Sequence, residues 1–333
     1  MSESYRLASD RPGERLDQFL ARRLPFMSRA QAQRLIAGGR VLVPGESAKS
    51  SLKLAAGRQV EVEVADPQPI AAQPEAIPLS VVHEDADLLV IDKPPGMPVH
   101  PGPGHEHATV VNAVLALCPD LAGIGDALRP GIVHRLDMNT SGLLIVAKNG
   151  QAQHALSLQM AERAVRKEYL ALVEGVPQAQ GIIDAPVGRH PGQRRQMAVV
   201  ANGRPARTHF TALGRAGANT LILARLETGR THQIRVHFAA TGHPVIGDAV
   251  YGHRSDLVER QFLHAWRLGF RHPTSGTWLA LEAPLPEDLQ QALRTALARA
   301  DTANVTRVID VLLQRAAAIS IAHQQPETPT ANR

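Results

Sequence analysis

Aromatic residues are scarce in this sequence of 333 residues, which contains three Tyr, two Trp and six Phe. It has a single cysteine, Cys118, so no disulfide can form within the chain. Cys118 lies in the apolar stretch TVVNAVLALC. A buried, unreactive thiol is expected there, because a catalytic thiol needs a basic and partly exposed setting. This cysteine usage is consistent with a reducing compartment, the cytoplasm.

Long apolar runs are also missing. The sequence has no stretch of about 18 apolar residues, so we expect no transmembrane helix and no membrane partner. The N-terminal sequence MSESYRLASD lacks the apolar core of a secretory signal. Apolar residues make up 44% and charged residues 20% of the chain, as in soluble globular proteins. The length is sufficient for two domains.

The chain has a net charge of +5, and its basic residues are concentrated in two stretches. Residues 15–53 contain six Arg and two Lys against two acidic residues, and residues 185–215 contain six Arg and no Asp or Glu. Arginine suits phosphate because its planar guanidinium donates two hydrogen bonds. A polyanionic partner is therefore favoured over two ordinary solvated faces. The candidate contacts are Arg29, Arg34, Arg189, Arg194 and Arg195.

Residues 1–66 predict a small domain of two short helices and a hairpin. The segment 15–24 has apolar residues at helical spacing, and Ser28 can cap a second helix that ends near Gly38. Strands are expected in RVLVPGES and in QVEVEV, where apolar residues alternate. Residues 67–78 contain four prolines, which predicts a semi-rigid linker.

Residues 79–300 predict one larger domain. Strand-like runs outnumber helical segments and do not alternate strictly with them, which favours an α+β fold with a mixed, largely antiparallel sheet. The strand-like runs are LSVV, DLLVID, GLLIVAK, KEYLALVEG, THFTAL, NTLILARLE, FLHAWRLGF and TWLALEA. The helical segments are 108–118, 150–163, 231–240 and 286–299. Within the tail, 301–333, we expect a helix over 301–318 and disorder after about residue 322.

A polar turn followed by an apolar strand gives the clearest chemical pattern. The turn in GIVHRLDMNTSGLLIVAK contains Asp137 as its only carboxylate, with Arg135 two positions before it. An aspartate in a polar turn is most often a cap or a turn former. The neighbouring arginine and the buried strand, which would fix the loop, favour a functional role here.

The motif HRLDMNTSG resembles the catalytic motif of the RluA-type pseudouridine synthases. The domain formed by residues 1–66 is similar to an S4 domain, a small RNA-binding fold that precedes the catalytic domain in several members. Together these matches cover nearly the whole chain. The further matching segments, in the order of the family, are VIDKPPGMPVHPGPG, RKEYLALVEG, LETGRTHQIRVH, VIGDAVYG and FLHAWRLGFRHPTSG.

The resemblance implies a role for individual residues. Asp137 matches the nucleophile, and Arg235 matches the arginine that pairs with the catalytic carboxylate. Tyr169 matches the tyrosine that stacks on the target base and is a candidate general base. Arg135 matches an arginine that holds the place of the flipped-out nucleotide or its phosphates, and Leu263 matches an apolar residue that packs against the base. The remaining expected contacts to RNA are His134 and Arg230.

These roles fit the isomerisation of uridine in structured RNA. The target base must leave the stack before it can react, and an aromatic ring such as that of Tyr169 replaces the lost stacking. A carboxylate beside C1′ can stabilise or trap the sugar once uracil has left. Attack of Asp137 at C6 of uracil is the alternative. Pairing with Arg235 would keep Asp137 ionised.

Other chemistries do not fit the sequence. The histidines of THQIRVH are five residues apart, whereas a zinc helix needs a spacing of four with a Glu between them. Helical spacing instead places Thr231 at an N-cap and Arg235 one turn further on. PPGMPVHPGPG lacks the phosphate-loop pattern, and Asp85 and Asp87 are expected in a turn before a strand rather than as a glycosidase pair. We therefore expect no metal, no nucleotide and no other cofactor.

Within the family, RHPGQRRQMAV and the S4-like domain resemble the D-type enzymes, which modify the loop of helix 69 in 23S rRNA. C-type enzymes, which also carry an S4 domain and act elsewhere on 23S rRNA, are the alternative. The expected partner is 23S rRNA or the large ribosomal subunit, and the expected form is a cytoplasmic monomer. A non-catalytic assembly factor is disfavoured by the intact Asp137, Tyr169 and Arg235. A nucleoside or glycoside hydrolase would release the free base.

Overall fold

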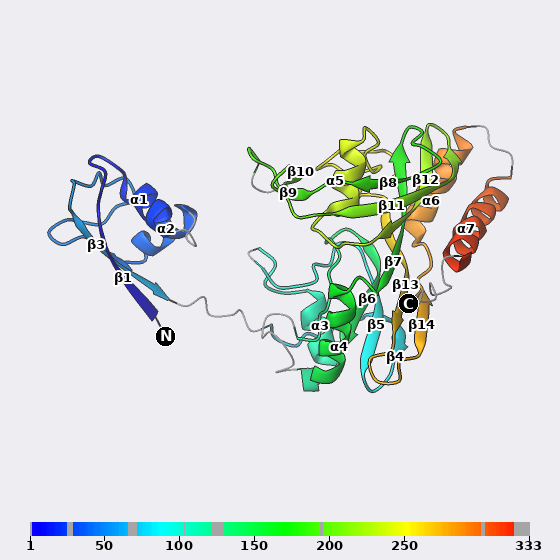
Figure 1. Ribbon diagram of the computed structural model, residues 1–333, viewed down its shortest axis with the longest axis horizontal. Coiled ribbons are helices and arrows are strands. Elements are labelled where there is room, and N and C mark those ends of the chain that lie inside the picture. The colour runs from blue at the N-terminus through cyan, green and yellow to red at the C-terminus, as the bar shows by residue number, and fades with distance from the viewer. Residues whose placement is uncertain are drawn as a thin grey trace, which may run out of the picture. The chain divides into compact units, whose positions relative to one another are not determined.

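Two units make up the chain, Met1–Pro69 and Ile70–Arg333 (Figure 1). Each unit is described by itself below. The computed structural model describes residues 2–24, 29–65, 72–102, 104–121, 130–193, 196–300 and 304–322.

The first unit is a three-stranded antiparallel sheet with two helices. The sheet has the order β1-β3-β2. Apolar residues of α1, among them Leu16 and Phe19, form a core with Val60 and Val62 of β3, so the expected helix and alternating strand are confirmed. Ser28, the expected cap of α2, lies outside the described residues. The elements are β1 (Ser2–Ala8), α1 (Leu16–Arg23), α2 (Arg29–Ala37), β2 (Val41–Leu42) and β3 (Gln59–Ala65).

Nine strands form the main sheet of the second unit, in the order β4-β5-β6-β13-β7-β12-β11-β8 with β14 paired to β13. Neighbours are antiparallel except β6 and β13, which are parallel, so the expected α+β fold is confirmed. The strands are β4 (Ser80–Glu84), β5 (Leu88–Lys93), β6 (Ser141–Ala147), β7 (Arg166–Glu174), β8 (Gln180–Asp184), β11 (Arg207–Ala216), β12 (Asn219–Leu226), β13 (Leu263–Arg271) and β14 (Trp278–Glu282).

Helices pack on both faces of this sheet. Side chains of β5 and β6 alternate between two clusters, one shared with α3 and the other with α4, so these helices lie on opposite faces. Helices α6 and α7 pack beside β11. Among the described residues no helix is both long and apolar enough to cross a membrane. The helices are α3 (Val110–Leu117), α4 (Gly150–Ala161), α5 (Gln233–Ala240), α6 (Glu287–Ala298) and α7 (Val305–Ala322), with a 3-10 turn over Pro119–Leu121.

β1 of the first unit was not expected from the sequence, and neither were three strands of the second unit. One is β8 at the sheet edge, and the others are β9 (Val187–Arg189) and β10 (Met197–Val199), which form a separate two-stranded hairpin. This hairpin, the arginine hairpin, carries part of the second basic stretch and lies beside α5 (Figure 1). Short strands of three residues give too little alternation for recognition in a sequence.

The second half of the expected linker contacts the second unit. The carboxylate of Glu75 accepts a hydrogen bond from the backbone N–H of Ala108, and its own N–H donates to the carbonyl of Asn112. The side chain of Asn112 also donates to the carbonyl of Gln73. Of the expected linker, residues 67–71 lie outside the described residues, and residues 72–78 hold the start of α3 in place.

A glycine brings β6 and β13 together where the functional site lies. Gly142 has φ +112°, and a Cβ there would lie 2.2 Å from the carbonyl oxygen of Ala265. Only glycine adopts this backbone conformation readily and leaves room for the facing strand. The close approach sets the turn before β6 next to the first residues of β13.

Candidate active site

A cavity of about 360 Å³ lies beside the turn that precedes β6. It is lined by Asp137, Tyr169, Arg230, His232 and Leu263, so four expected site residues and one unexpected one come together. Its volume is in the range of small-molecule sites, on the order of 300–1,000 Å³. Residues far apart in the sequence meet here because β13 lies between β6 and β7 in the sheet.

Asp137 is held in this cavity by a buried arginine. Nη1 of Arg235 donates to Oδ2 of Asp137 at 3.0 Å. The same guanidinium donates from Nε and Nη2 to the two carboxylate oxygens of Asp248, at 2.6 and 2.9 Å. Burial would lower the pKa of Arg235, but the bonds to Asp248 and Asp137 raise it overall, so the group stays charged. Asp248 was not singled out in the sequence.

The helix that presents Arg235 begins one residue later than expected. The N-cap of α5 is His232, not Thr231, and it has the left-handed φ of +56° and makes no side-chain capping bond. The side chain of Gln233 fixes the loop before the helix, because its oxygen accepts from the N–H of Arg230 at 3.0 Å and from the hydroxyl of Thr228 at 2.7 Å. The helix start is thereby fixed without a capping residue of the usual kind.

Tyr169 faces the cavity from the middle of β7 and is 7% exposed. Burial and, next, the negative charge of Asp137 raise the pKa of the phenol above its ordinary value. A phenol that holds its proton so strongly is a poor general base. The ring faces the cavity, as the expected stacking role requires, whereas the raised pKa disfavours the role of general base.

His232 connects the cavity to the arginine hairpin. Nδ1 of His232 lies 2.7 Å from the hydroxyl of Tyr251, and that hydroxyl accepts from the N–H of Met197 in β10 at 2.9 Å. The hydroxyl therefore donates its hydrogen to Nδ1, which leaves the ring proton of a neutral His232 on Nε2. Nε2 lies 3.8 Å from Oδ1 of Asp137. Burial lowers the pKa of His232, which favours this neutral form.

Two buried cations hold the backbone of the turn around Asp137, which is called the catalytic turn. Neither cation was singled out in the sequence. Nζ of Lys93, fully buried, donates to the carbonyl of Met138 at 2.9 Å and to two carbonyls in its own loop. Arg260 donates to the carbonyl of Asn139 at 3.0 Å and forms a two-point ion pair with Asp288 of α6. The backbone on the C-terminal side of Asp137 is therefore fixed from two directions.

The two residues before Leu136 have different surroundings. Nε2 of His134 accepts from the backbone N–H of Ile145 in β6 at 2.9 Å. Burial and, next, the charge of Lys167 lower the pKa of His134 to about 3. His134 thus ties the turn to β6 through Nε2, and the residue also lines the cavity. Arg135 is exposed at the cavity.

Lys167 is a cationic cavity residue that was not singled out in the sequence. It lies two positions before Tyr169 on β7, is 7% exposed and lines the same cavity beside Arg230. Burial and, next, the charge of Arg230 lower its pKa. The alternation of side chains along a strand would have placed it on the same face as Tyr169.

The basic stretches are only partly available to a polyanion. Asp17 is fully buried and accepts hydrogen bonds from Arg15, Arg29 and Gln33, so Arg29 is committed in part within its own unit. Arg189 is exposed at the end of β9. Arg194, Arg195 and the side chain of Arg34 lie outside what the structure describes.

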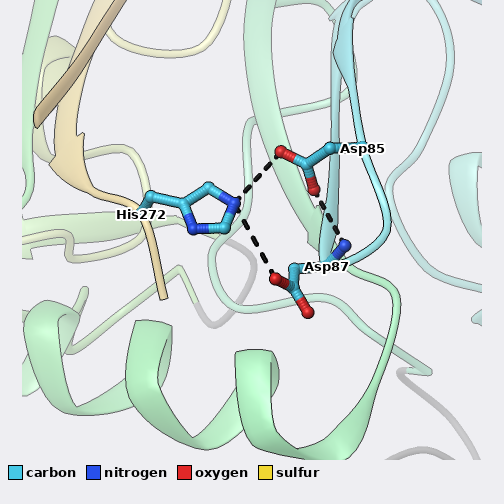
Figure 2. Close-up of side chains that lie close together, drawn as sticks. All are labelled: Asp85, Asp87 and His272. Carbon is cyan, nitrogen blue, oxygen red and sulfur yellow. Dashed lines mark hydrogen bonds and ion pairs between the residues drawn. The ribbon is translucent and has the colours of Figure 1, made fainter. Parts of the chain in front are cut away.

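A second polar cluster lies outside the cavity, where Asp85, Asp87 and His272 have ligand atoms within 4.8 Å of one another. Figure 2 shows Nε2 of His272 directed at both carboxylates. Nδ1 of His272 accepts from the N–H groups of Thr274 and Ser275, so its proton lies on Nε2 and is donated to Asp85.

The carboxylate of Asp85 has no vacant acceptor for a metal. One oxygen faces His272 and His83, and the other accepts the N–H groups of Asp87 and Leu88. The cluster therefore fixes the β4–β5 turn to the turn that follows β13. The expectation that Asp85 and Asp87 lie in a turn before a strand is confirmed.

Comparisons with known proteins agree with this geometry. A family model described as RNA pseudouridylate synthase matches residues 87–240, and an S4 domain model matches residues 14–60. An uncharacterized RNA pseudouridine synthase of Chloroflexus aurantiacus is 54% identical over 86% of this chain and 91% of its own length. The ribosomal large subunit pseudouridine synthase D of Nitrosomonas europaea is 47% identical over 85% of this chain and 84% of its own length.

A solved structure, human RNA pseudouridylate synthase domain containing 1, is 31% identical, with a TM-score of 0.52 over 66% of this chain and 86% of that chain. The similarity therefore extends from sequence to fold. Asp137, the carboxylate of the motif HRLDMNTSG, lines the cavity. The chain belongs to the RNA pseudouridine synthases and carries an S4 domain before its catalytic domain.

Proposed function

We propose that the protein converts uridine to pseudouridine in the loop of helix 69 of large-subunit ribosomal RNA, with Asp137 as the nucleophile. The observation that carries the proposal is the position of Asp137, which faces the cavity opposite Tyr169 and is fixed by Arg235 at 3.0 Å. Similar proteins named ribosomal large subunit pseudouridine synthase D support the choice of RNA.

The first half of the reaction breaks the bond between C1′ and N1. The flipped-out uracil stacks on Tyr169 and packs against Leu263, which replaces the stacking lost from the loop. An oxygen of Asp137 forms a bond to C1′ while the C1′–N1 electron pair leaves with uracil. The fixed guanidinium of Arg235 orients the carboxylate for this attack and needs no reorganisation.

The second half reattaches the same uracil. The base turns within the cavity until C5 faces C1′, the C5–C1′ bond forms, and Asp137 leaves with its electron pair. The proton on C5 is then lost and N1 gains one, so the product is an isomer of the substrate. Attack of Asp137 at C6 gives the same product and differs in the bond that the carboxylate forms.

An assay on a helix-69 stem-loop and on whole 23S rRNA, with pseudouridine mapped site by site, tests the proposal. The wild-type protein should modify the loop. Asp137→Asn should lose at least about a thousandfold in rate and keep its affinity for RNA. Asp120→Asn, which changes an exposed aspartate beside α3, is the matched control and should be fully active.

The outcomes separate the parts of the proposal. Modification of 23S rRNA only at other sites would reject helix 69 and favour the C-type assignment. Turnover by Asp137→Asn within tenfold of wild type would remove Asp137 from the nucleophile role. Release of free uracil would contradict isomerisation altogether.

A further inference from the structure

We propose that Lys167 and Arg230 form a binding site for a single phosphate group of the RNA strand, next to the target nucleotide. The proposal rests on the proposed function, because it takes RNA as the occupant of the cavity. It adds a phosphate contact within the catalytic cavity, separate from the basic stretches of the S4 domain and the arginine hairpin.

The first observation is a charge without a counter-ion on a largely buried side chain. Lys167 is 7% exposed and lines the cavity. Among the described residues, Nζ of Lys167 has no carboxylate within 4.0 Å and no hydrogen-bond acceptor. A buried ammonium group is costly unless an anion or acceptor compensates it. The nearby Glu168 does not serve, because its carboxylate binds Arg166 and Ser320.

The second observation is an arginine beside it with free donors. The Nε of Arg230 donates to the carbonyl of Pro205, whereas neither Nη atom has a partner among the described residues. Burial and, next, the charges of Arg204 and Arg163 lower the pKa of Arg230. The carboxylate of Glu227 is already engaged by Arg207 and His209. Arg230 therefore has no carboxylate partner among the described residues.

The chain also leaves room for a ligand at this point. Gly229, which has no side chain, lies beside the ammonium group: a Cβ there would be 3.8 Å from Nζ of Lys167. Lys167 and Arg230 both line the cavity and have N–H groups without a partner in the described part of the chain. Such groups can donate to the non-bridging oxygens of a phosphodiester.

The position of the pair suits a phosphate rather than the base. Lys167 and Tyr169 are alternate residues of β7, so their side chains leave the same face about 7 Å apart. With uracil stacked on Tyr169 and C1′ at Asp137, the backbone of the nucleotide must pass on a side of the sugar away from the ring. Lys167 and Arg230 line the same cavity, where a phosphate of this backbone can reach them.

A phosphate scan tests the site. Stem-loop RNAs, each with one uncharged methylphosphonate in place of a phosphate around the target uridine, are assayed by single turnover with wild type, Lys167→Met and Lys167→Arg. For the wild-type protein, methylphosphonate at one position should lower kcat/KM by about ten- to a hundredfold. Lys167→Met should show a similar loss with unmodified RNA and little further loss at that position. Lys167→Arg should recover most of the rate.

Controls keep the result interpretable. Arg294→Met, a change to an ion-paired residue on α6, should behave as wild type at every position. Arg230→Met should repeat the pattern of Lys167→Met at the same phosphate, which guards against misfolding of a single variant. If the loss caused by each variant and the loss caused by each methylphosphonate simply multiplied at every position, the phosphate site would be wrong. Failure of wild type to modify the unsubstituted stem-loop would instead reject the proposed function.

Discussion

Asp248 binds two nitrogen atoms of Arg235 and leaves the third, Nη1, for Asp137. Asp248 is 1% exposed, and its Oδ1 also accepts the N–H groups of Val250 and Tyr251, so its own position is fixed by the turn that contains it. The direction of Nη1 is therefore set by a carboxylate that does not touch the cavity. Asp248 is therefore a positioning residue for Asp137, the proposed nucleophile.

Replacing Asp248 should impair chemistry more than binding. In Asp248→Asn the side chain can no longer accept both N–H groups of Arg235, so Nη1 loses its fixed direction. We expect kcat to fall by about a hundredfold and the Kd for RNA to stay within threefold. Arg235→Lys should be similarly impaired, because one ammonium cannot serve both carboxylates. Single-turnover rates measure the loss in kcat, and RNA titrations measure the Kd. A wild-type rate for Asp248→Asn would contradict the positioning role.

Lys93 should contribute strongly to the stability of the second unit. Lys93→Met leaves the carbonyls of Pro94, Met97 and Met138 without their common donor, which should cost about 2–4 kcal/mol of unfolding free energy. Both tryptophans lie in this unit, so fluorescence during urea unfolding measures the change. Arg299→Met, which removes an exposed ion pair with Asp256, is the control, with an expected cost below about 1 kcal/mol.

Buried neutral histidines should make the second unit sensitive to mild acid. The pKa of His134 is lowered by burial from 6.5 to about 3, and that of His264 to about 4. Below pH 6.5 the unfolded chain therefore binds protons that the folded protein does not, so stability falls as the pH drops from about 6.5 to about 4. Each histidine contributes up to about 1.4 kcal/mol per pH unit.

Urea unfolding at pH 7, 6, 5 and 4.5 measures this dependence. His134→Gln keeps an acceptor for the N–H of Ile145 but does not titrate, so its unfolding free energy should depend less on pH by about one proton. The same slope in wild type and His134→Gln would show that His134 is not the group responsible.

The S4 domain should supply affinity that depends on salt. Residues 1–65 contain eleven Lys and Arg and seven Asp and Glu, a net charge of 11 − 7 = +4. A truncated protein that begins at residue 72 keeps Gln73 and Glu75, which hold α3. It should bind rRNA more weakly and with a shallower dependence on salt than the full chain. Binding at three salt concentrations decides the matter, and unchanged affinity and slope would exclude the domain from this contact.

The sequence predicted the elements with strong periodicity and the residues with distinctive motifs. The helix at 15–24 and the strand KEYLALVEG are regular enough to predict, and Asp137 lies in the most specific motif. The start of α5 was misplaced because His232 enters the helix in a left-handed conformation and Gln233 fixes the loop before it, an arrangement that residue preferences do not predict.

The supporting residues could not be predicted because their roles depend on tertiary contacts. Lys93 and Met138 are 45 positions apart, and Arg260 and Asn139 are 121 apart. Nothing local in VIDKPPG or VERQFL indicates that their cations hold the catalytic turn. Asp248 lies within the segment VIGDAVYG, but its pairing with Arg235 depends on the fold and cannot be inferred from the sequence.

The cations that hold the catalytic turn contact main-chain oxygens, those of Met138 and Asn139. Every amino acid provides such an oxygen, so changes of side chain at these two positions leave both bonds intact. The donors have no equivalent freedom, since a shorter or uncharged residue in place of Lys93 or Arg260 cannot reach the same atoms. Among natural variants of this enzyme, we therefore expect diversity to accumulate at positions 138 and 139, while positions 93 and 260 stay constant.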